Sequence, residues 1–163
     1  MTRHRSNRRG FTLIELLIVF AMLGLIMAMS VPKLRVFRST ANVRAARDQI
    51  ASSIVTARAA AIQKSRQARF QVRGNGVSVR VDTSILNNGN RMEMTVLSQR
   101  ALDTLFGVRV TVEPAGDSVL RFDSRGIGST TSNGPTRYLV RNTNNVDTLC
   151  VTRFGLVSKR GCT

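Results

Sequence analysis

One acidic side chain lies within an apolar segment near the amino terminus, and it calls for a positively charged partner. Between Phe11 and Val31 the only ionisable residue is Glu15, and a helix of this length, at about 1.5 Å per residue, can cross the hydrocarbon core of a membrane. A carboxylate in lipid costs on the order of 3 kcal/mol, so we expect a cation to neutralise it. The segment contains none. The cation must therefore come from another chain or from a new amino terminus, which cleavage between Gly10 and Phe11 would create.

These residues resemble a known processing site. Gly10-Phe11-Thr12-Leu13-Ile14-Glu15, followed by an apolar segment, closely resembles the cleavage site of type IV prepilins and type II secretion pseudopilins. The resemblance implies that prepilin peptidase cleaves after Gly10 and N-methylates Phe11. It also implies that Glu15 pairs with the terminal amine of a neighbouring subunit during filament assembly. The partners implied are this peptidase, other pilin or pseudopilin subunits and the inner membrane.

Two other interpretations of the amino terminus are open. A secretory signal peptide also has a basic start and an apolar core, but it is cut after the core, where Ala28-Met29-Ser30 is a weak site. A plain membrane anchor would explain the apolar segment and leave the Gly10–Phe11 junction without a role. The prepilin hypothesis accounts for more of these residues than either alternative.

The chain is strongly basic, with 25 Lys and Arg residues, 9 acidic residues and a formal net charge of +16. Four of the basic residues lie in the first ten positions, which predicts that this end is cytoplasmic and that the chain spans the membrane once, with a periplasmic carboxyl-terminal domain. The resemblance implies that this membrane is the bacterial inner membrane. The remaining excess of positive charge favours polyanions as partners, including nucleic acid and anionic lipid. The alternative is that these side chains, which are mostly Arg, are solvated surface groups.

A helical pattern continues beyond the apolar segment, and we expect the helix to reach about Gln67. Pro32 has no N–H to donate, which predicts a kink near the membrane exit. Arg44, Arg47 and Arg58 flank an apolar stripe and are expected to be hydrated rather than ligand-binding. The stripe follows the helical period and is expected to face a sheet; it comprises Val36, Val43, Ile50, Ile54, Ala57 and Ala61.

From Arg69 onward the apolar pattern changes to the two-residue period of β-strands. Gly74 and Asn75 predict a hairpin turn, because both residues tolerate a positive φ, and the Gly-rich segment 124–135 predicts a flexible loop. The fold class expected is therefore α+β, with a long amino-terminal helix packed on an antiparallel β-sheet, as in the type IV pilin-like fold. Strands are expected at 70–72, 77–81, 92–97, 108–112, 119–122, 137–140 and 149–151.

These features divide the chain into four parts. They are a cleaved leader at 1–10, a transmembrane and assembly helix at 11–31, its amphipathic continuation at 32–67 and a periplasmic β-sheet domain at 68–163. Within the last part, Leu120–Gly126 and Phe154–Val157 look like segments of the GspH/FimT group of minor pilins and pseudopilins. That resemblance implies a minor subunit of a type II secretion pseudopilus or of a type IV pilus.

Cys150 and Cys162 are the only cysteines, and an even number in a periplasmic domain predicts a disulfide, with two free thiols as the alternative. Two isolated cysteines cannot form a zinc site without histidines, and the only histidine lies in the leader. We therefore expect no metal and no cofactor.

The loop that such a disulfide would close contains three basic residues, Arg153, Lys159 and Arg160, and no acidic one. This tail is a candidate for binding phosphate groups. FimT-like minor pilins of natural transformation resemble this arrangement and bind DNA through a Gly-Arg-x-Arg segment. The corresponding stretch here, 155–160, lacks both motif arginines. Because of the basic tail and this resemblance, DNA binding for uptake is the alternative function, although the motif itself is not matched.

Enzymatic function is not expected. The predicted mature chain has no histidine, and its acidic residues are scattered without a close pair in a recognisable acid–base or metal-binding motif.

Overall fold

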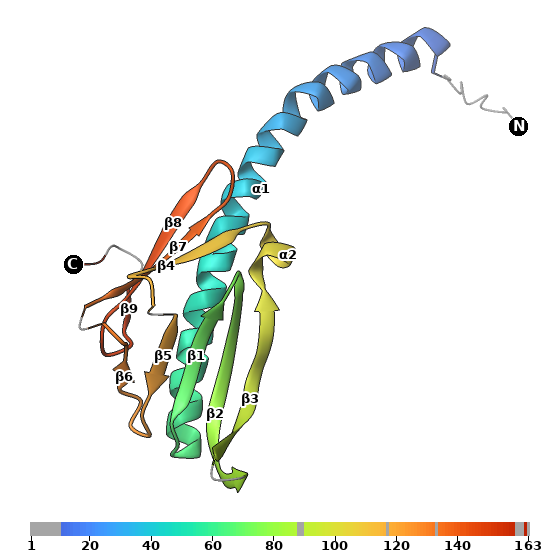
Figure 1. Cartoon of the computed structure of the whole chain (residues 1–163). Helices are drawn as coiled ribbons and strands as arrows, with labels where there is room; N and C mark the ends of the chain where they lie inside the picture. Colours follow the sequence, from blue (N-terminus) through green and yellow to red (C-terminus); the bar gives the residue numbers. More distant parts are fainter. Residues whose placement is uncertain (1–10, 88–89, 117, 133, 159–161, 163) are drawn as a thin grey trace, which may run out of the picture. The chain divides into compact units, whose positions relative to one another are not determined.

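The computed structural model describes residues 11–87, 90–116, 118–132, 134–158 and 162. Gly10, Lys159 and Arg160, three of the predicted site residues, lie outside this part of the chain. The chain forms two compact units, Met1–Arg38 and Ser39–Thr163, and each is described by itself. The first unit is helical from Leu13 on, and the second combines the rest of that helix with two antiparallel sheets (Figure 1).

Helix α1 spans Leu13–Lys64 and ends three residues before the expected boundary at Gln67. The reason is a change of backbone conformation at Ser65, whose φ is 50°. The N–H of Ser65 donates to the carbonyl of Ile62, and that of Arg66 donates to the carbonyl of Ala61. This pair of hydrogen bonds is the Schellman motif, which satisfies the last carbonyls of a helix and stops it. The motif is usually formed around glycine, so its use of Ser65 hides the boundary in the sequence.

The first sheet, sheet A, has five strands in the order β3-β2-β1-β5-β6. Gly74 and Asn75 form the turn between β1 and β2, as predicted, with a φ of 59° at Gly74. Strands β2 and β3 are longer than expected, because their main-chain pairing continues with register shifts where the apolar alternation breaks down. The strands are β1 Ala68–Arg73, β2 Gly76–Asn87, β3 Asn90–Ala101, β5 Val119–Phe122 and β6 Gly128–Ser129.

The second sheet, sheet B, has four strands in the order β4-β7-β8-β9. The expectation of one sheet is therefore wrong. The short helix α2, Leu102–Phe106, follows β3 and leads the chain to the first strand of sheet B, and Gly107 ends this helix with a φ of 64°. A single turn of helix and two-residue strands are too short to show a periodic pattern of apolar residues. The sequence pattern therefore did not predict α2, β6 and β9. The strands are β4 Arg109–Glu113, β7 Thr136–Arg141, β8 Val146–Val151 and β9 Val157–Ser158.

One apolar core holds together the helix and the two sheets of the second unit. The predicted stripe of α1 is buried from Val43 to Ala61, as expected for a helix packed on a sheet. Val36 is an exception, because it belongs to the first unit and is 62% exposed. Both sheets contribute side chains to the core, and the rings of Phe70 in sheet A and Tyr138 in sheet B meet edge to face with centroids 5.9 Å apart. The helix and sheets therefore share one core, which confirms the predicted α+β packing.

Two glycines hold the sheets together where side chains would not fit. The N–H of Gly128 in β6 donates to the carbonyl of Phe154 in the β8–β9 turn at 3.0 Å. A Cβ atom on Gly128 would come within 2.7 Å of the Gly155 nitrogen, and one on Gly155 would come within 2.9 Å of the Phe122 ring. Gly155 also has a φ of 79°, which disfavours other residues. The segments Leu120–Gly126 and Phe154–Val157, far apart in the sequence, thus meet at this junction.

We expect Gly155→Ala to destabilise the protein by about 2 kcal/mol, because the new methyl group would overlap the Phe122 ring at a strained φ. Thermal unfolding of the full-length chain in detergent, followed by circular dichroism, should show a midpoint lowered by about 4–8 °C. Gly134→Ala is the matched control, because no atom lies within 4 Å of its Cβ position. Equal midpoints for the two variants would contradict the close approach.

Candidate functional site

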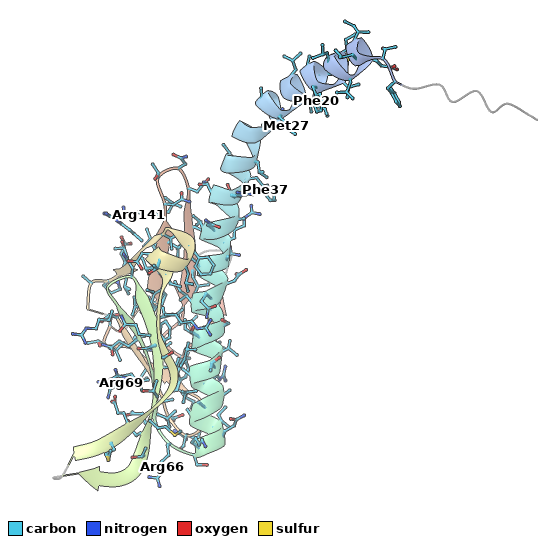
Figure 2. The ribbon with its side chains drawn as sticks, turned by 90° about the vertical axis from the view of Figure 1, so that its right-hand side faces the viewer. Phe20, Met27, Phe37, Arg66, Arg69 and Arg141 are labelled. Carbon is cyan, nitrogen blue, oxygen red and sulfur yellow. A yellow bond between two sulfur atoms is a disulfide. The ribbon has the colours of Figure 1, made fainter. Side chains whose placement is uncertain are left out.

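The first unit has an apolar surface on every side of α1. Large apolar residues from Phe11 to Met27 are exposed, and five of them are consecutive, from Leu16 to Phe20. Five consecutive helical positions cover all directions around the axis, and Figure 2 labels two members of this surface, Phe20 and Met27. A helix that is apolar all round is normally covered by lipid or protein.

The membrane placement of 11–31 and the kink at Pro32 stay predictions. In the part of the chain that the structure describes, no helix meets the length and hydropathy expected of a membrane span. Pro32 lies inside α1, which is assigned as one helix from Leu13 to Lys64.

A capped helix start holds Glu15 in place. The N–H of Glu15 donates to the Oγ1 of Thr12 at 3.3 Å, which makes Thr12 the cap of α1. A Thr followed three residues later by Glu has the spacing of a capping box. The carboxylate lies in the first helical turn, where the helix dipole favours a negative charge, and it is exposed. Glu15 is therefore at a defined helix end and accessible to a partner.

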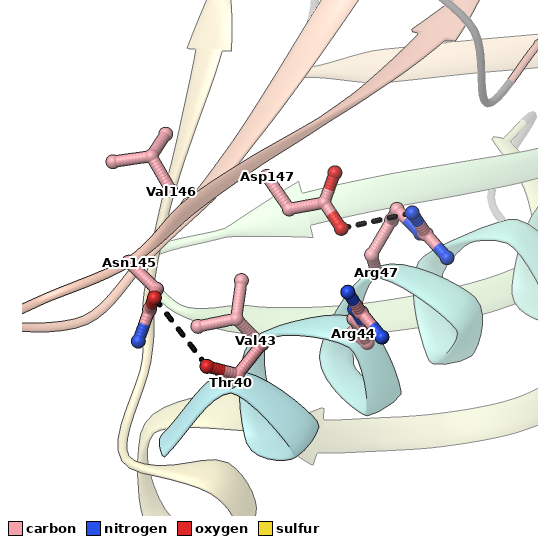
Figure 3. A pocket seen from close by; sticks show the side chains of 7 residues that line it. All are labelled: Thr40, Val43, Arg44, Arg47, Asn145, Val146 and Asp147. Carbon is pink, nitrogen blue, oxygen red and sulfur yellow. Dashed lines mark hydrogen bonds and ion pairs between the residues drawn. The ribbon is translucent and has the colours of Figure 1, made fainter. Parts of the chain in front are cut away.

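A second cluster ties α1 to the turn between β7 and β8. The Nδ2 of Asn142 donates to both the carbonyl and the Oγ of Ser39, each at 2.9 Å, and the Nδ2 of Asn145 donates to the same Oγ at 3.0 Å. Next to these bonds is a cavity of about 480 Å³, whose lining includes Thr40 and Arg44 (Figure 3). The hydrogen bonds position the turn against the start of the second unit.

The expectation that Arg47 is hydrated is wrong. Its side chain is only 17% exposed, and it forms ion pairs with Asp147 at 2.8 Å and with Asp48 at 3.1 Å. Arg44 is exposed, as expected, and Arg58 is half-buried. Asp147 comes from β8, about 100 residues away in the sequence, so the helical pattern around Arg47 could not reveal this partner.

At the other end of the chain, a disulfide joins Cys150 of β8 to Cys162, as predicted, with the Cα atoms 5.3 Å apart. The alternative of two free thiols is wrong. The bridge closes a loop that contains the turn between β8 and β9. Hydrogen bonds within this turn, among them Leu156 N–H to Thr152 Oγ1 at 3.1 Å, fix its shape.

A small cavity of about 210 Å³ opens beside this loop, next to the Gly-rich segment. The guanidinium of Arg153 lies 4.6 Å from the centre of the Phe154 ring, and Phe154 is 51% exposed. The Gly-rich segment contributes Ile127 and several hydroxyl side chains to the lining. Sequence reasoning selected Arg153 and overlooked Phe154 as a contact residue; an aromatic next to a basic residue in a turn is the signal that was available.

Part of the segment predicted to be a flexible loop has a defined structure. The Oδ1 of Asp123 accepts hydrogen bonds from the N–H groups of Ile127 at 2.8 Å and Arg125 at 2.9 Å. These bonds, that from Ile127 foremost, hold the pKa of the Asp123 carboxyl below its ordinary value. The turn leads directly into β6, which pairs with β5.

Loss of the disulfide should destabilise the second unit. Cys162→Ala would remove the closure of a loop with a sequence separation of 12, worth about 3 kcal/mol in the chain-entropy model. We expect its thermal midpoint to fall by about 6–12 °C relative to the oxidised parent chain. A reducing agent should produce a similar fall in the parent chain and none in the variant. A variant as stable as the oxidised parent would contradict this role.

One comparison with known protein families concerns the amino-terminal end of the chain. Residues 5–31 match the family model described as the prokaryotic N-terminal methylation motif. No curated protein sequence matches the chain.

Among solved structures, the chain is similar to the type IV minor pilin FimU of Pseudomonas aeruginosa in two crystal forms. One form covers 77% of this chain and 92% of FimU, with a TM-score of 0.54 and 15% identity. The other covers 72% and 92%, with a TM-score of 0.51 and 15% identity. At this identity the likeness shows a shared fold.

FimU is a minor pilin, which agrees with the expectation from the sequence of a structural protein rather than an enzyme. The chain thus combines a prokaryotic N-terminal methylation motif at residues 5–31 with a fold similar to that of the type IV minor pilin FimU.

Proposed function

We propose that the chain is a minor pilin or pseudopilin subunit that assembles into a type II secretion pseudopilus or a type IV pilus. Prepilin peptidase cleaves it after Gly10 and N-methylates Phe11. The observation that carries this proposal is the exposed apolar surface around α1 from Phe11 to Met27, which begins at a capped turn bearing Glu15.

This apolar surface requires a partner on every side. Before assembly, the lipid of the inner membrane covers it, with the basic leader on the cytoplasmic side and the second unit in the periplasm. After assembly, the equivalent helices of neighbouring subunits cover it. Both environments satisfy the same side chains, because neither contains water.

Glu15 then sets the register between subunits. In the apolar surroundings of packed helices an unpaired carboxylate is costly, and the methylated amine of Phe11 on a neighbouring subunit retains a positive charge that can neutralise it. Exposure of Glu15 within the first turn supports this contact between chains.

The minor-subunit assignment is supported by the junction at Gly128 and Gly155. Leu120–Gly126 and Phe154–Val157 are the segments that resemble the GspH/FimT group, and they meet where Gly155 lies against the buried ring of Phe122. The resemblance is thus to one continuous part of the second unit rather than to two unrelated stretches.

We expect Glu15→Ala to reduce incorporation into filaments by at least about tenfold, because the terminal amine of the next subunit loses its counter-charge. Filaments sheared from cells would be assayed for the subunit by immunoblot. Mass spectrometry of the cellular chain would verify cleavage after Gly10 and methylation of Phe11. Glu113→Ala, which removes an exposed acidic residue of the second unit, is the control. Normal incorporation of a correctly processed Glu15→Ala chain would refute the proposed pairing.

We propose DNA binding during uptake as a second candidate function, on one specific observation. Arg153 is stacked on the exposed ring of Phe154 beside a cavity, within the loop that the disulfide closes. A cation next to an exposed aromatic ring suits a nucleic-acid strand, since the cation meets phosphate and the ring stacks on a base. Lys159 and Arg160 would add positive charge to the same loop.

Phe154→Ala should weaken binding of single-stranded DNA by a factor of about 5–150, the usual range for one stacked base. Arg153→Ala and Lys159→Ala/Arg160→Ala should weaken it and reduce its dependence on salt. The measurement is fluorescence anisotropy with the full-length chain in detergent at several salt concentrations. Arg125→Ala is the control, because Arg125 is exposed but lies outside the loop. Affinity that is absent, or equal in all variants, argues against this site.

A further inference from the structure

Two arginines face each other on the outer surface of sheet B. Arg109 of β4 and Arg141 of β7 are direct cross-strand partners, and both side chains are exposed. Their neighbours in the next pair, Val110 and Val140, point towards the core. Figure 2 shows Arg141 projecting away from α1. Like charges directly opposite each other destabilise a strand pair, so this arrangement is unfavourable without an anion.

The charges of this pair are not balanced by an acidic group in the described part of the chain. The Nη2 of Arg141 donates to the neutral Oγ1 of Thr111 at 3.0 Å. The carboxylate of β4, Glu113, lies four residues along the strand from Arg109, about 13 Å away, and faces Arg137. The local excess is therefore two positive charges.

A cavity of about 320 Å³ lies at this pair of arginines. In addition to Arg109 and Arg141 it is lined by Gly107, Asn142 and Thr143, so none of its described lining residues is acidic or apolar. The two guanidinium groups offer five N–H donors each, in a planar arrangement that matches oxyanions. Thr143 is exposed and adds a hydroxyl group.

Both sides of the cavity are held by hydrogen bonds to other parts of the second unit. On the β4 side, the Oδ1 of Asn75 accepts from the N–H of Val110 at 3.1 Å. On the β7 side, Asn142 is bonded to Ser39 of α1, and its Oδ1 accepts from the N–H of Asn145 at 2.9 Å. A ligand would thus meet strand ends that are already positioned, which lowers the entropic cost of binding.

We infer that Arg109 and Arg141 form a binding site for a dianionic phosphate group, either inorganic phosphate or a terminal phosphate monoester. Two guanidinium groups neutralise two negative charges, whereas a carboxylate or a phosphodiester would leave one positive charge unpaired. The site is separate from Glu15 and from the disulfide loop, so it does not depend on the functions proposed above.

The test uses the full-length chain in detergent, titrated with inorganic phosphate, glycerol 3-phosphate, dimethyl phosphate or acetate at constant ionic strength. Binding is measured by calorimetry and by the thermal midpoint, which a ligand of the folded state raises. We expect phosphate to bind and to raise the midpoint more than acetate or dimethyl phosphate does. Binding of glycerol 3-phosphate as well would support a monoester as the ligand, and binding of phosphate alone would support the free ion.

Arg109→Gln and Arg141→Gln should each weaken phosphate binding by at least about tenfold, because each removes charged hydrogen-bond donors. Without phosphate, neither variant should have a lower midpoint, since each relieves the repulsion between like charges. Arg137→Gln, on the same strand but opposite Glu113, is the matched control and should bind as the parent chain does. No phosphate binding, equal binding of acetate, or an equal loss in the Arg137→Gln variant would overturn the inference.

Discussion

The burial of one face of α1 is the interaction on which the second unit depends. Val43, Ile50 and Ile54 supply the larger apolar side chains of this face, and Ala57 and Ala61 let the sheets approach closely. Neither sheet has a second apolar layer of its own in the described chain, so each obtains its core by packing on the same helix. The edge-to-face contact of Phe70 with Tyr138 then joins the two sheets to each other.

The remaining contacts hold the edges of this arrangement. Gly128 and Gly155 allow sheet A and the β8–β9 turn to touch through their main chains. Asn142 and Arg47 join the β7–β8 hairpin to α1 by hydrogen bonds and an ion pair. Because these bonds are partly shielded from water, they specify geometry more effectively than exposed pairs would. They also place the cavities described above at the boundaries between elements.

The distribution of charge is uneven in a way that the net charge alone does not convey. Arg47 forms ion pairs with two carboxylates, those of Asp48 and Asp147. Arg69 and Arg80 both form ion pairs with Glu93 on the outer face of sheet A. Arg109 and Arg141, by contrast, lie opposite each other, and no carboxylate is among the described residues that line their cavity. The excess of basic residues therefore favours a specific anion site only where no acidic partner already neutralises the basic side chains.

The sequence by itself determined the features that depend on neighbouring residues. The Gly10–Glu15 segment lies in the methylation motif, the helical stripe from Val43 to Ala61 predicted the buried face of α1, and Gly74-Asn75 predicted a hairpin turn. Each of these follows from local periodicity or local backbone preference. The cysteine pair was also predicted correctly, since two cysteines allow only one intramolecular bridge.

Only the tertiary structure decided which distant residues meet. The division into two sheets, the pairing of Arg47 with Asp147, and the juxtaposition of Arg109 with Arg141 depend on strand order and register. A shift of one residue in register would send these side chains to the opposite face. Local patterns do not encode that register, because it is set by packing of the whole core. For this reason the methylation motif could be recognised in the sequence, whereas the arginine pair could not.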